Sequence, residues 1–301
     1  MALLVLGTVA LDNVKTPSGV KKNMLGGSAA HFSMSARLFD DVNVVGVVGK
    51  DFPRVHLDFL KRKGIDTSSL TMASGTTFRW SGEYKKENLN SAVTHDTKLG
   101  VLADYAPVIT EDQKKMGYVF LANLAPLVQE KLLSLMKSPE FIGMDTMNLW
   151  INTALRDLKR VMKKVDLLVL NDGEARLLTG EANVVRSAEV LRAMGPRIVV
   201  VKKGEHGVYV FGGSFQFGYP AFPVKKVVDP TGAGDTFAGG LFGFIAKARK
   251  FDEKTFRRAA VYATVLASFN VEGFGVGETA PLTMREVEKR LKEYQQFCAW
   301  A

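Results

Sequence analysis

The sequence predicts an α/β protein with a mainly parallel central sheet between two layers of helices. Short apolar runs typical of buried strands alternate along the chain with longer helical patterns. This alternation favours parallel pairing of the strands, with the connecting helices covering both faces of the sheet. The length of 301 residues, of which 47% are hydrophobic and 24% charged, suffices for one large core. Ligands of such sheets bind beyond the carboxyl ends of the strands, so polar residues at those ends are candidate site residues.

The individual elements follow from local patterns. The expected strands are Leu3–Val9, Val42–Val48, Tyr118–Ala122, Phe141–Asp145, Leu167–Leu170, Ile198–Lys202 and Val208–Phe211. The expected helices are Gly27–Phe39, Pro53–Lys63, Gln129–Met136, Leu155–Val165, Gly173–Thr179, Ala188–Met194, Asp235–Arg249, Phe256–Ser268 and Thr283–Trp300, the last with the capping-box spacing of Thr283 and Glu286. Two segments, 12–25 and 76–105, interrupt the alternation. The second is long for a structureless loop, so strands are favoured there over surface loops.

The segment from Val228 to Gly240 carries the clearest chemical signal. Its sequence is VDPTGAGDTFAGG, and a long apolar helical pattern follows it. A Gly-Ala-Gly turn that opens a helix presents unpaired backbone N–H groups at the positive end of the helix dipole, where an anion can bind. Asp235 stands in the first helical turn beside this site. A carboxylate next to an anion site suggests phosphoryl transfer, in which the carboxylate accepts the proton of an attacking hydroxyl.

Other interpretations of these glycines fit less well. A simple turn and helix start explains Asp, Pro and Gly here, but leaves the small residues at 232–234 unexplained. The dinucleotide fingerprint G-x-G-x-x-G fails because Phe237 stands at its third glycine. A Walker loop fails because Val44 replaces its first glycine and Asp51 replaces its Ser or Thr.

The stretch DPTGAGDTF, residues 229–237, closely resembles the C-terminal signature of the ribokinase/PfkB carbohydrate kinase family. GGSAA at 26–30 resembles its N-terminal signature, NDGE at 171–174 resembles its N-x-x-E motif, and 199–207 looks like the strand and turn before the C-terminal signature. The matches run in family order and cover nearly the whole chain. The resemblance implies a ribokinase-like three-layer αβα sandwich, a single domain over 1–301, with a small β-sheet lid formed near 12–25 and 76–105.

The resemblance also implies an ATP-dependent kinase that transfers the γ-phosphate to a hydroxyl of a sugar. Asp235 would be the general base. The backbone N–H groups of Gly232, Ala233, Gly234 and Asp235 would form an anion hole that stabilises charge on the phosphoryl group. A carboxylate also suits a helix N-terminus electrostatically, so a structural role for Asp235 stays open.

Residues at two strand ends are implied in nucleotide and metal binding. Glu174 would help to hold hydrated Mg²⁺, for which one carboxylate suffices because the ion keeps several waters. Asn171 would lie near the phosphates, although Asn171 and Asp172 are also candidates to cap the next helix, with Asp172 the cap if both roles hold. Nucleotide contacts are further expected from Lys202, from Gly204 and Gly207 in the turn after it, and from Asn270 near the adenine. Asp229 is a candidate for a monovalent cation site.

The acceptor would bind at the other end of the chain. By resemblance, Asp12 hydrogen-bonds substrate hydroxyls, while a turn-forming role is its alternative. Gly26 and Gly27 would allow the substrate to approach closely. His31 stands where the family often has Asn, and this departure leaves the identity of the sugar open. His31 would either hydrogen-bond a substrate hydroxyl or be a satisfied helix histidine.

Composition limits the partners. The net charge of +9 suits anionic ligands such as nucleotides, but the basic residues are spread in pairs without a long basic tract, so nucleic-acid binding is disfavoured. No apolar run is long enough to span a membrane, the start reads as a strand and not a signal peptide, and Cys298 is the single cysteine. These features predict a cytoplasmic protein without membrane association. A homodimer through the lid is an open option.

Three hypotheses therefore remain. The first is a sugar kinase. The second is a nucleoside kinase on the same scaffold, which the departure at His31 and the unusual lid keep open. The third is a catalytically idle ligand-binding or scaffold protein, which the combination of Asp235, the anion-hole glycines, Asn171 and Glu174 disfavours.

Overall fold

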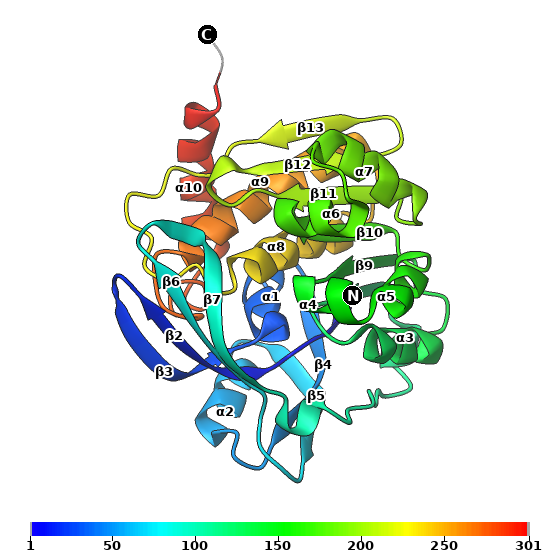
Figure 1. Cartoon of the computed structure of the whole chain (residues 1–301), viewed down its shortest axis with the longest axis vertical. Coiled ribbons are helices and arrows are strands. Elements are labelled where there is room, and N and C mark those ends of the chain that lie inside the picture. The colour runs from blue at the N-terminus through cyan, green and yellow to red at the C-terminus, as the bar shows by residue number, and fades with distance from the viewer. Residues whose placement is uncertain (1, 300–301) are drawn as a thin grey trace.

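The computed structural model describes residues 2–299 and is built around a nine-stranded sheet (Figure 1). From one edge to the other its strands are β13 (Gln216–Tyr219), β12 (Val208–Phe211), β11 (Ile198–Lys202), β10 (Leu167–Asn171), β9 (Phe141–Asp145), β8 (Tyr118–Leu121), β1 (Ala2–Leu6), β4 (Asp41–Gly49) and β5 (Ile65–Ala73). All neighbours from β11 to β5 pair in parallel, whereas β12 and β13 pair antiparallel. The predicted mainly parallel sheet is confirmed.

Alternating side chains of the strands divide the core into two layers. Leu3 and Val5 of β1 belong to one cluster of buried residues, and Leu4 and Leu6 belong to the other. The first cluster includes residues of α1 (Ser28–Ala36), α2 (Arg54–Arg62), α8 (Ala233–Ala248) and α9 (Glu253–Asn270). The second includes residues of α3 (Pro126–Leu135), α4 (Asn148–Thr153), α5 (Leu155–Met162), α6 (Asp172–Thr179) and α7 (Val184–Ala193). Helices therefore cover both faces, and α10 (Met284–Phe297) packs outside α9.

Two strands of the large sheet were not expected. β5 has the sequence IDTSSLTMA, and β13 is only four residues long. Both lie at the edges of the sheet, where one side of the strand is exposed and polar residues are tolerated. The first strand also ends at Leu6 and not at Val9, because the chain enters a second sheet at Ala10.

A smaller sheet contains the segments that interrupted the alternation. Its strand order is β3 (Gly19–Gly26), β2 (Ala10–Thr16), β6 (Arg79–Lys85) and β7 (Asn88–Lys98). Along β2, Asp12, Val14 and Thr16 are buried, whereas Lys15 is exposed. The buried face is directed at the segment that precedes α8, since the Thr16 hydroxyl donates to the carbonyl of Val228 at 2.7 Å.

Candidate functional site

The N-terminus of α8 forms the centre of the candidate site. Gly232 precedes the helix with a left-handed φ of 76°, a conformation that favours glycine. The N–H groups of Gly232, Gly234 and Asp235 donate to no acceptor within residues 2–299, so they are available to an anion. Ala233 differs from the prediction, because its N–H donates to the Pro230 carbonyl at 3.1 Å. The structure thus offers three free donors where four were expected.

Lys202 lies directly beside this helix start. Its ammonium group contacts a carboxylate oxygen of Asp145 at 2.9 Å, and both side chains are largely buried. A Cβ atom on Gly234 would lie 2.9 Å from the Nζ atom of Lys202. Glycine at 234 therefore makes room for the ammonium group next to the anion site. Asp145 was missed from the sequence, although it ends the expected strand Phe141–Asp145 at the edge where ligands bind.

The Lys202 ammonium group interacts electrostatically with three carboxylates, those of Asp145, Glu174 and Asp235. Burial raises the pKa of Asp235 to about 7, and the negative charge of Asp145 adds to the shift while Lys202 opposes it. Burial likewise raises the pKa of Glu174 to about 7, with further contributions from Asp145 and Asp235. A carboxylate with a pKa near neutrality is suited to proton transfer at ordinary pH. The arrangement also attracts positive charge, because three carboxyl groups face one cation.

Asn171 and Glu174 form a reciprocal capping box at the start of α6. The Glu174 N–H donates to the Asn171 side chain at 2.8 Å, and the Asn171 N–H donates to the Glu174 carboxylate at 2.7 Å. Asn171 is therefore the helix cap, and the expectation that Asp172 would cap is wrong; Asp172 instead pairs with Arg176. The capping interpretation accounts for the local geometry, while the charge environment of Glu174 is consistent with a nearby cation.

The residues present suit a hydrated Mg²⁺ ion better than a fully liganded one. Within residues 2–299 no three His, Cys, Asp or Glu side chains stand close enough together to enclose a metal. Mg²⁺ commonly binds through one or two carboxylates and completes its octahedron with water and phosphate oxygens. Glu174 and Asp145 carry the carboxylates that fit this mode.

Asp12 lies on the buried face of the small sheet, near the start of α1. A Cβ atom on Gly26 would lie 1.9 Å from a carboxylate oxygen of Asp12, so glycine is required there. The Gly27 N–H donates to the same carboxylate at 3.3 Å. Burial raises the pKa of Asp12 to about 7, with Asp229 and Asp235 adding to the shift. Asp12, Gly26, Gly27 and Asp235 are thus brought together as the prediction required.

His31 and Asn270 lie beneath the helix start and are inaccessible to solvent. The Asn270 amide donates to the Thr231 carbonyl at 2.8 Å, and its oxygen accepts from Thr236 at 2.9 Å and contacts Nδ1 of His31 at 3.1 Å. The oxygen is an acceptor in all these contacts, so Nδ1 of His31 carries the hydrogen. Burial lowers the pKa of His31, which favours this neutral form. Both residues support the signature segment from below, and their burial does not favour the predicted direct contacts with acceptor and adenine.

Other predicted residues also have structural roles. Asp229 is fully buried, and its carboxylate accepts from the N–H groups of Thr231 at 2.9 Å and Gly275 at 3.1 Å. It therefore joins the signature segment to the loop around Gly275. Gly204 and Gly207 have φ angles of 54° and 92°, and a Cβ on Gly207 would lie 2.0 Å from the Tyr219 carbonyl oxygen. The backbone alone explains glycine at Gly207.

The small sheet contributes residues that the sequence did not single out. Burial raises the pKa of Tyr84 in β6 to about 12, and the nearby carboxylates of Asp229, Asp12 and Asp235 add to this shift. The phenol is therefore neutral and close to the reaction centre. At the end of the same hairpin, the Asn90 side chain donates to Glu205 at 3.1 Å. Neither residue belongs to a recognisable motif, so only their placement in the fold reveals them.

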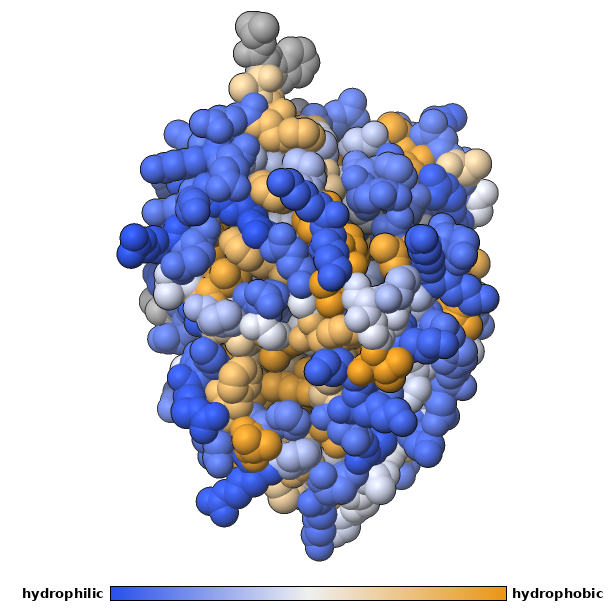
Figure 2. Space-filling model, turned by 90° about the vertical axis from the view of Figure 1, so that its left-hand side faces the viewer, coloured by the Kyte–Doolittle hydropathy of each residue, from blue (hydrophilic) through white to orange (hydrophobic). Residues whose placement is uncertain are grey.

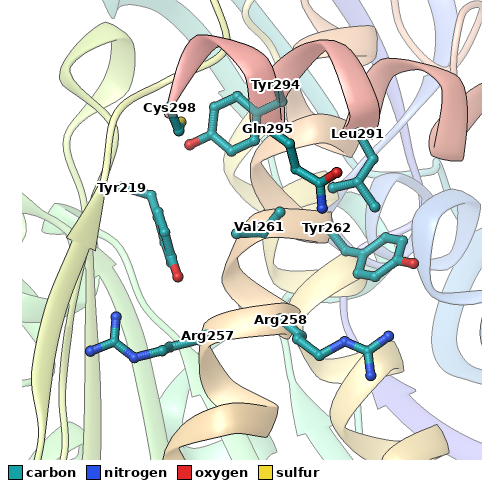
Figure 3. Close-up of a pocket in the computed structure, with 9 residues that line it drawn as sticks. All are labelled: Tyr219, Arg257, Arg258, Val261, Tyr262, Leu291, Tyr294, Gln295 and Cys298. Atoms are coloured by element: carbon teal, nitrogen blue, oxygen red, sulfur yellow. The ribbon is translucent and has the colours of Figure 1, made fainter. Parts of the chain in front are cut away.

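A cavity of about 340 Å³ lies elsewhere, along α9 and α10 (Figure 3). Tyr219 and Arg257 stand on one side of α9, Arg258 and Tyr262 on the other, and Tyr294 and Cys298 reach in from α10. Arg257 is thirteen positions from Asn270 on the same helix, which corresponds to about 20 Å. This cavity contains none of the candidate catalytic residues.

Comparison with known proteins finds kinases that match most of the chain. The family model of the pfkB family carbohydrate kinases matches residues 5–283. Cytidine kinase of Thermococcus kodakarensis is 31% identical over 258 residues, covering 83% of this chain and 91% of that protein. Ribokinase of Bacillus subtilis is 29% identical over 271 residues, covering 88% and 87%.

Solved structures share the fold across most of the chain. A putative ribokinase II from E. coli, solved in complex with ATP and Mg²⁺, superimposes with a TM-score of 0.80 at 19% identity, covering 97% of this chain and 99% of that one. The fold is therefore ribokinase-like, as predicted. The match of the family model over most of the sequence shows that this chain belongs to the pfkB family of carbohydrate kinases.

Proposed function

We propose that the protein transfers the γ-phosphate of ATP to a hydroxyl group of a sugar or nucleoside. The observation that carries this proposal is the group of free N–H donors at the start of α8, with Lys202 and Asp235 beside it. These donors would stabilise charge on the transferring phosphoryl group. Asp235 would accept the proton of the attacking hydroxyl, and Asp12 would hold the acceptor through hydrogen bonds to its hydroxyls. Mg²⁺ near Glu174 would neutralise phosphate charge when bound.

We further infer that the small sheet is a lid over the acceptor. Its buried face carries Asp12 and approaches the signature segment through Thr16. Seen from the side of the small sheet and α10, the molecule has a central hydrophobic band surrounded by hydrophilic residues (Figure 2). A lid that excludes water protects the phosphoryl group from hydrolysis. Three expectations stay predictions: a homodimer through this sheet, a cytoplasmic location and a monovalent cation at Asp229. Within residues 2–299 no helix is long and apolar enough to cross a membrane.

A screen of acceptors tests the proposed reaction. Sugars and nucleosides are supplied with ATP and Mg²⁺, and both ADP and the phosphorylated product are measured. The Asp235→Asn variant should lose on the order of 10²- to 10⁴-fold in kcat, because the amide cannot accept the proton, while ATP binding measured by calorimetry is retained. Full activity of Asp235→Asn would exclude the assigned base. A wild-type protein that binds these ligands but phosphorylates none of them would favour the idle-scaffold hypothesis.

One feature of the lid favours a nucleoside as the acceptor. A Cβ atom on Gly82 would lie 2.3 Å from Cζ2 and Cη2 of Trp80, so the indole ring lies across Gly82. Trp80 pairs in register with Asp12, and such partners face the same side of a sheet. The Trp80 ring nitrogen donates to Thr94 at 3.2 Å, which fixes the ring. A flat aromatic face beside the hydroxyl-binding carboxylate suits a stacked nucleobase, in keeping with the relative named cytidine kinase.

Trp80→Ala separates the two acceptor classes. Stacking of a base on an aromatic ring contributes roughly 1–3 kcal/mol, so KM for nucleosides should rise roughly 5- to 150-fold. KM for a free sugar should change little, and Trp80→Phe should retain most of the affinity for nucleosides. An equal effect of Trp80→Ala on both classes would favour the sugar as the acceptor.

A further inference from the structure

The hairpin of β6 and β7 crosses from the acceptor side of the candidate site to its nucleotide side. At the acceptor side, β6 pairs in parallel with β2, which carries Asp12. At the far end, the Asn90 amide donates to the Glu205 carboxylate at 3.1 Å. In Figure 1 this hairpin rises from the small sheet toward the connection that precedes β12. One element of the lid therefore contacts both halves of the site.

The contact at Asn90 is close and shapes the local sequence. The side-chain oxygen of Asn90 lies 2.3 Å from the position that a Cβ of Gly204 would occupy. Gly204 also has a left-handed φ of 54°. Within residues 2–299, Asn90 is the only hydrogen-bond partner of the Glu205 carboxylate. Asn90 at the end of the hairpin therefore contacts the turn twice: it packs against the backbone at Gly204 and donates a hydrogen bond to the side chain of Glu205.

This turn directly follows the lysine at the phosphate side of the site. Lys202 ends β11, and its ammonium group lies between Asp145 and Gly234. The turn is closed by the hydrogen bond from the Lys203 N–H to the Gly207 carbonyl at 2.8 Å. A group that holds the turn also holds the end of the strand that positions Lys202.

We propose that Asn90 is a positioning residue that fastens the closed lid to the Gly204–Glu205 turn, so that closure over the acceptor is coupled to the nucleotide side of the site. The inference rests on the function proposed above. Both partners are exposed, so the bond contributes only a small stabilisation. A weak bond suits a contact that must form and break in each catalytic cycle.

The first test removes each partner in turn. Asn90→Ala and Glu205→Ala should each lower kcat/KM for the acceptor on the order of 2- to 13-fold, the range expected for an ordinary hydrogen bond, because both partners are exposed. Each should also raise the fraction of ADP released without phosphorylated acceptor, because an unfastened lid admits water. The double variant should be no worse than the single ones. Single effects that multiply in the double variant, or the absence of any effect, would overturn the proposal.

A second test exchanges donor and acceptor. Asn90→Asp alone places two carboxylates side by side and should lower kcat/KM at least as much as Asn90→Ala. Combining Asn90→Asp with Glu205→Gln restores a hydrogen bond with its direction reversed, so kcat/KM and the ADP-to-product ratio should recover. Lys86→Ala, in the exposed turn of the same hairpin, is the matched control and should behave as wild type. Failure of the exchanged pair to improve on Asn90→Asp would exclude this contact as the cause.

A third measurement distinguishes failure of this inference from failure of the proposed reaction. Hydrogen exchange of the amides at 86–92 reports lid contact without any turnover. Glu205→Ala should accelerate their exchange, and Glu205→Gln combined with Asn90→Asp should restore protection. Unchanged exchange in Glu205→Ala overturns the contact even in an active enzyme. A wild-type protein that phosphorylates no acceptor overturns the proposed reaction, whatever the exchange data show.

Discussion

At the scale of single residues, the site combines buried carboxyl groups that are costly to ionise. Asp12 is 5% exposed, and its pKa is raised to about 7, mainly by burial. An aspartate in an unfolded chain has a pKa of about 3.9. Between these values the folded state binds more protons than the unfolded state, so this group's contribution to the free energy of unfolding falls as pH rises. The ionised Asp12 that would bind the acceptor thus lowers the free energy of unfolding of the protein.

Asp12→Asn should therefore stabilise the protein in a pH-dependent way. The amide keeps an oxygen for the Gly27 N–H but carries no charge. Relative to wild type, Tm should rise by about 2–8 °C at pH 8, where the cost of the ionised carboxylate is fully present. The gain should shrink as pH falls from 7 toward 4, where Asp12 of the folded wild type becomes protonated. Thermal unfolding from pH 4 to 8 measures this difference, and a gain that grows on acidification would contradict it.

At the scale of elements, helices and strands could be predicted where their local sequence pattern suits the environment that they occupy in the fold. The capping-box spacing of Thr283 and Glu286 predicted the start of α10, and both hydrogen bonds of that capping box are present. The turn before α8 was predictable because Gly-Ala-Gly has few uses other than an open helix start. β5 was not predictable, because its mixture of polar and apolar residues matches an exposed edge only once β4 is known to lie beside it.

The candidate site was partly predictable for the same reason. Lys202 ends β11 and Asp235 stands in the first turn of α8, so their positions at the ligand edge follow from the topology of a parallel sheet. Asp12 lies inside β2 of the small sheet, and its place in the site was expected from the resemblance alone. Asn270 was expected near the adenine by resemblance, and His31 was expected either to bond a substrate hydroxyl or to be a satisfied helix histidine. Both side chains face the signature segment. Burial of a polar residue beneath a loop depends on packing between α1 and α9 and the loop, which no local pattern records. Asn90 escaped notice because its partner is 115 positions away.

At the scale of the whole molecule, the C-terminal helix supports the functional end of α9 from outside. Arg290 in α10 donates to the Ser268 hydroxyl at 3.0 Å and pairs with Glu272 at 2.7 Å. Its guanidinium group also lies 3.5 Å from the centre of the Phe269 ring. These partners flank Asn270, which holds the signature segment through Thr231. One mostly buried side chain therefore connects the outer helix layer to the elements that position the anion site.

Arg290→Met tests this long connection. The substitution retains the apolar stem but removes a charged hydrogen bond, an ion pair and the cation–π contacts with Phe222 and Phe269. Together these losses should lower the stability by about 1–3 kcal/mol. For a domain of this size the corresponding fall in Tm is about 2–10 °C. Arg290→Lys is the matched control, since it keeps the positive charge near Glu272 but lacks the planar group that lies over Phe269. Its Tm should fall between those of wild type and Arg290→Met. If the connection holds only the two helices together, kcat at a temperature well below both Tm values will be unchanged. If it also steadies the signature segment, kcat will fall along with Tm, and the larger fall will be in Arg290→Met.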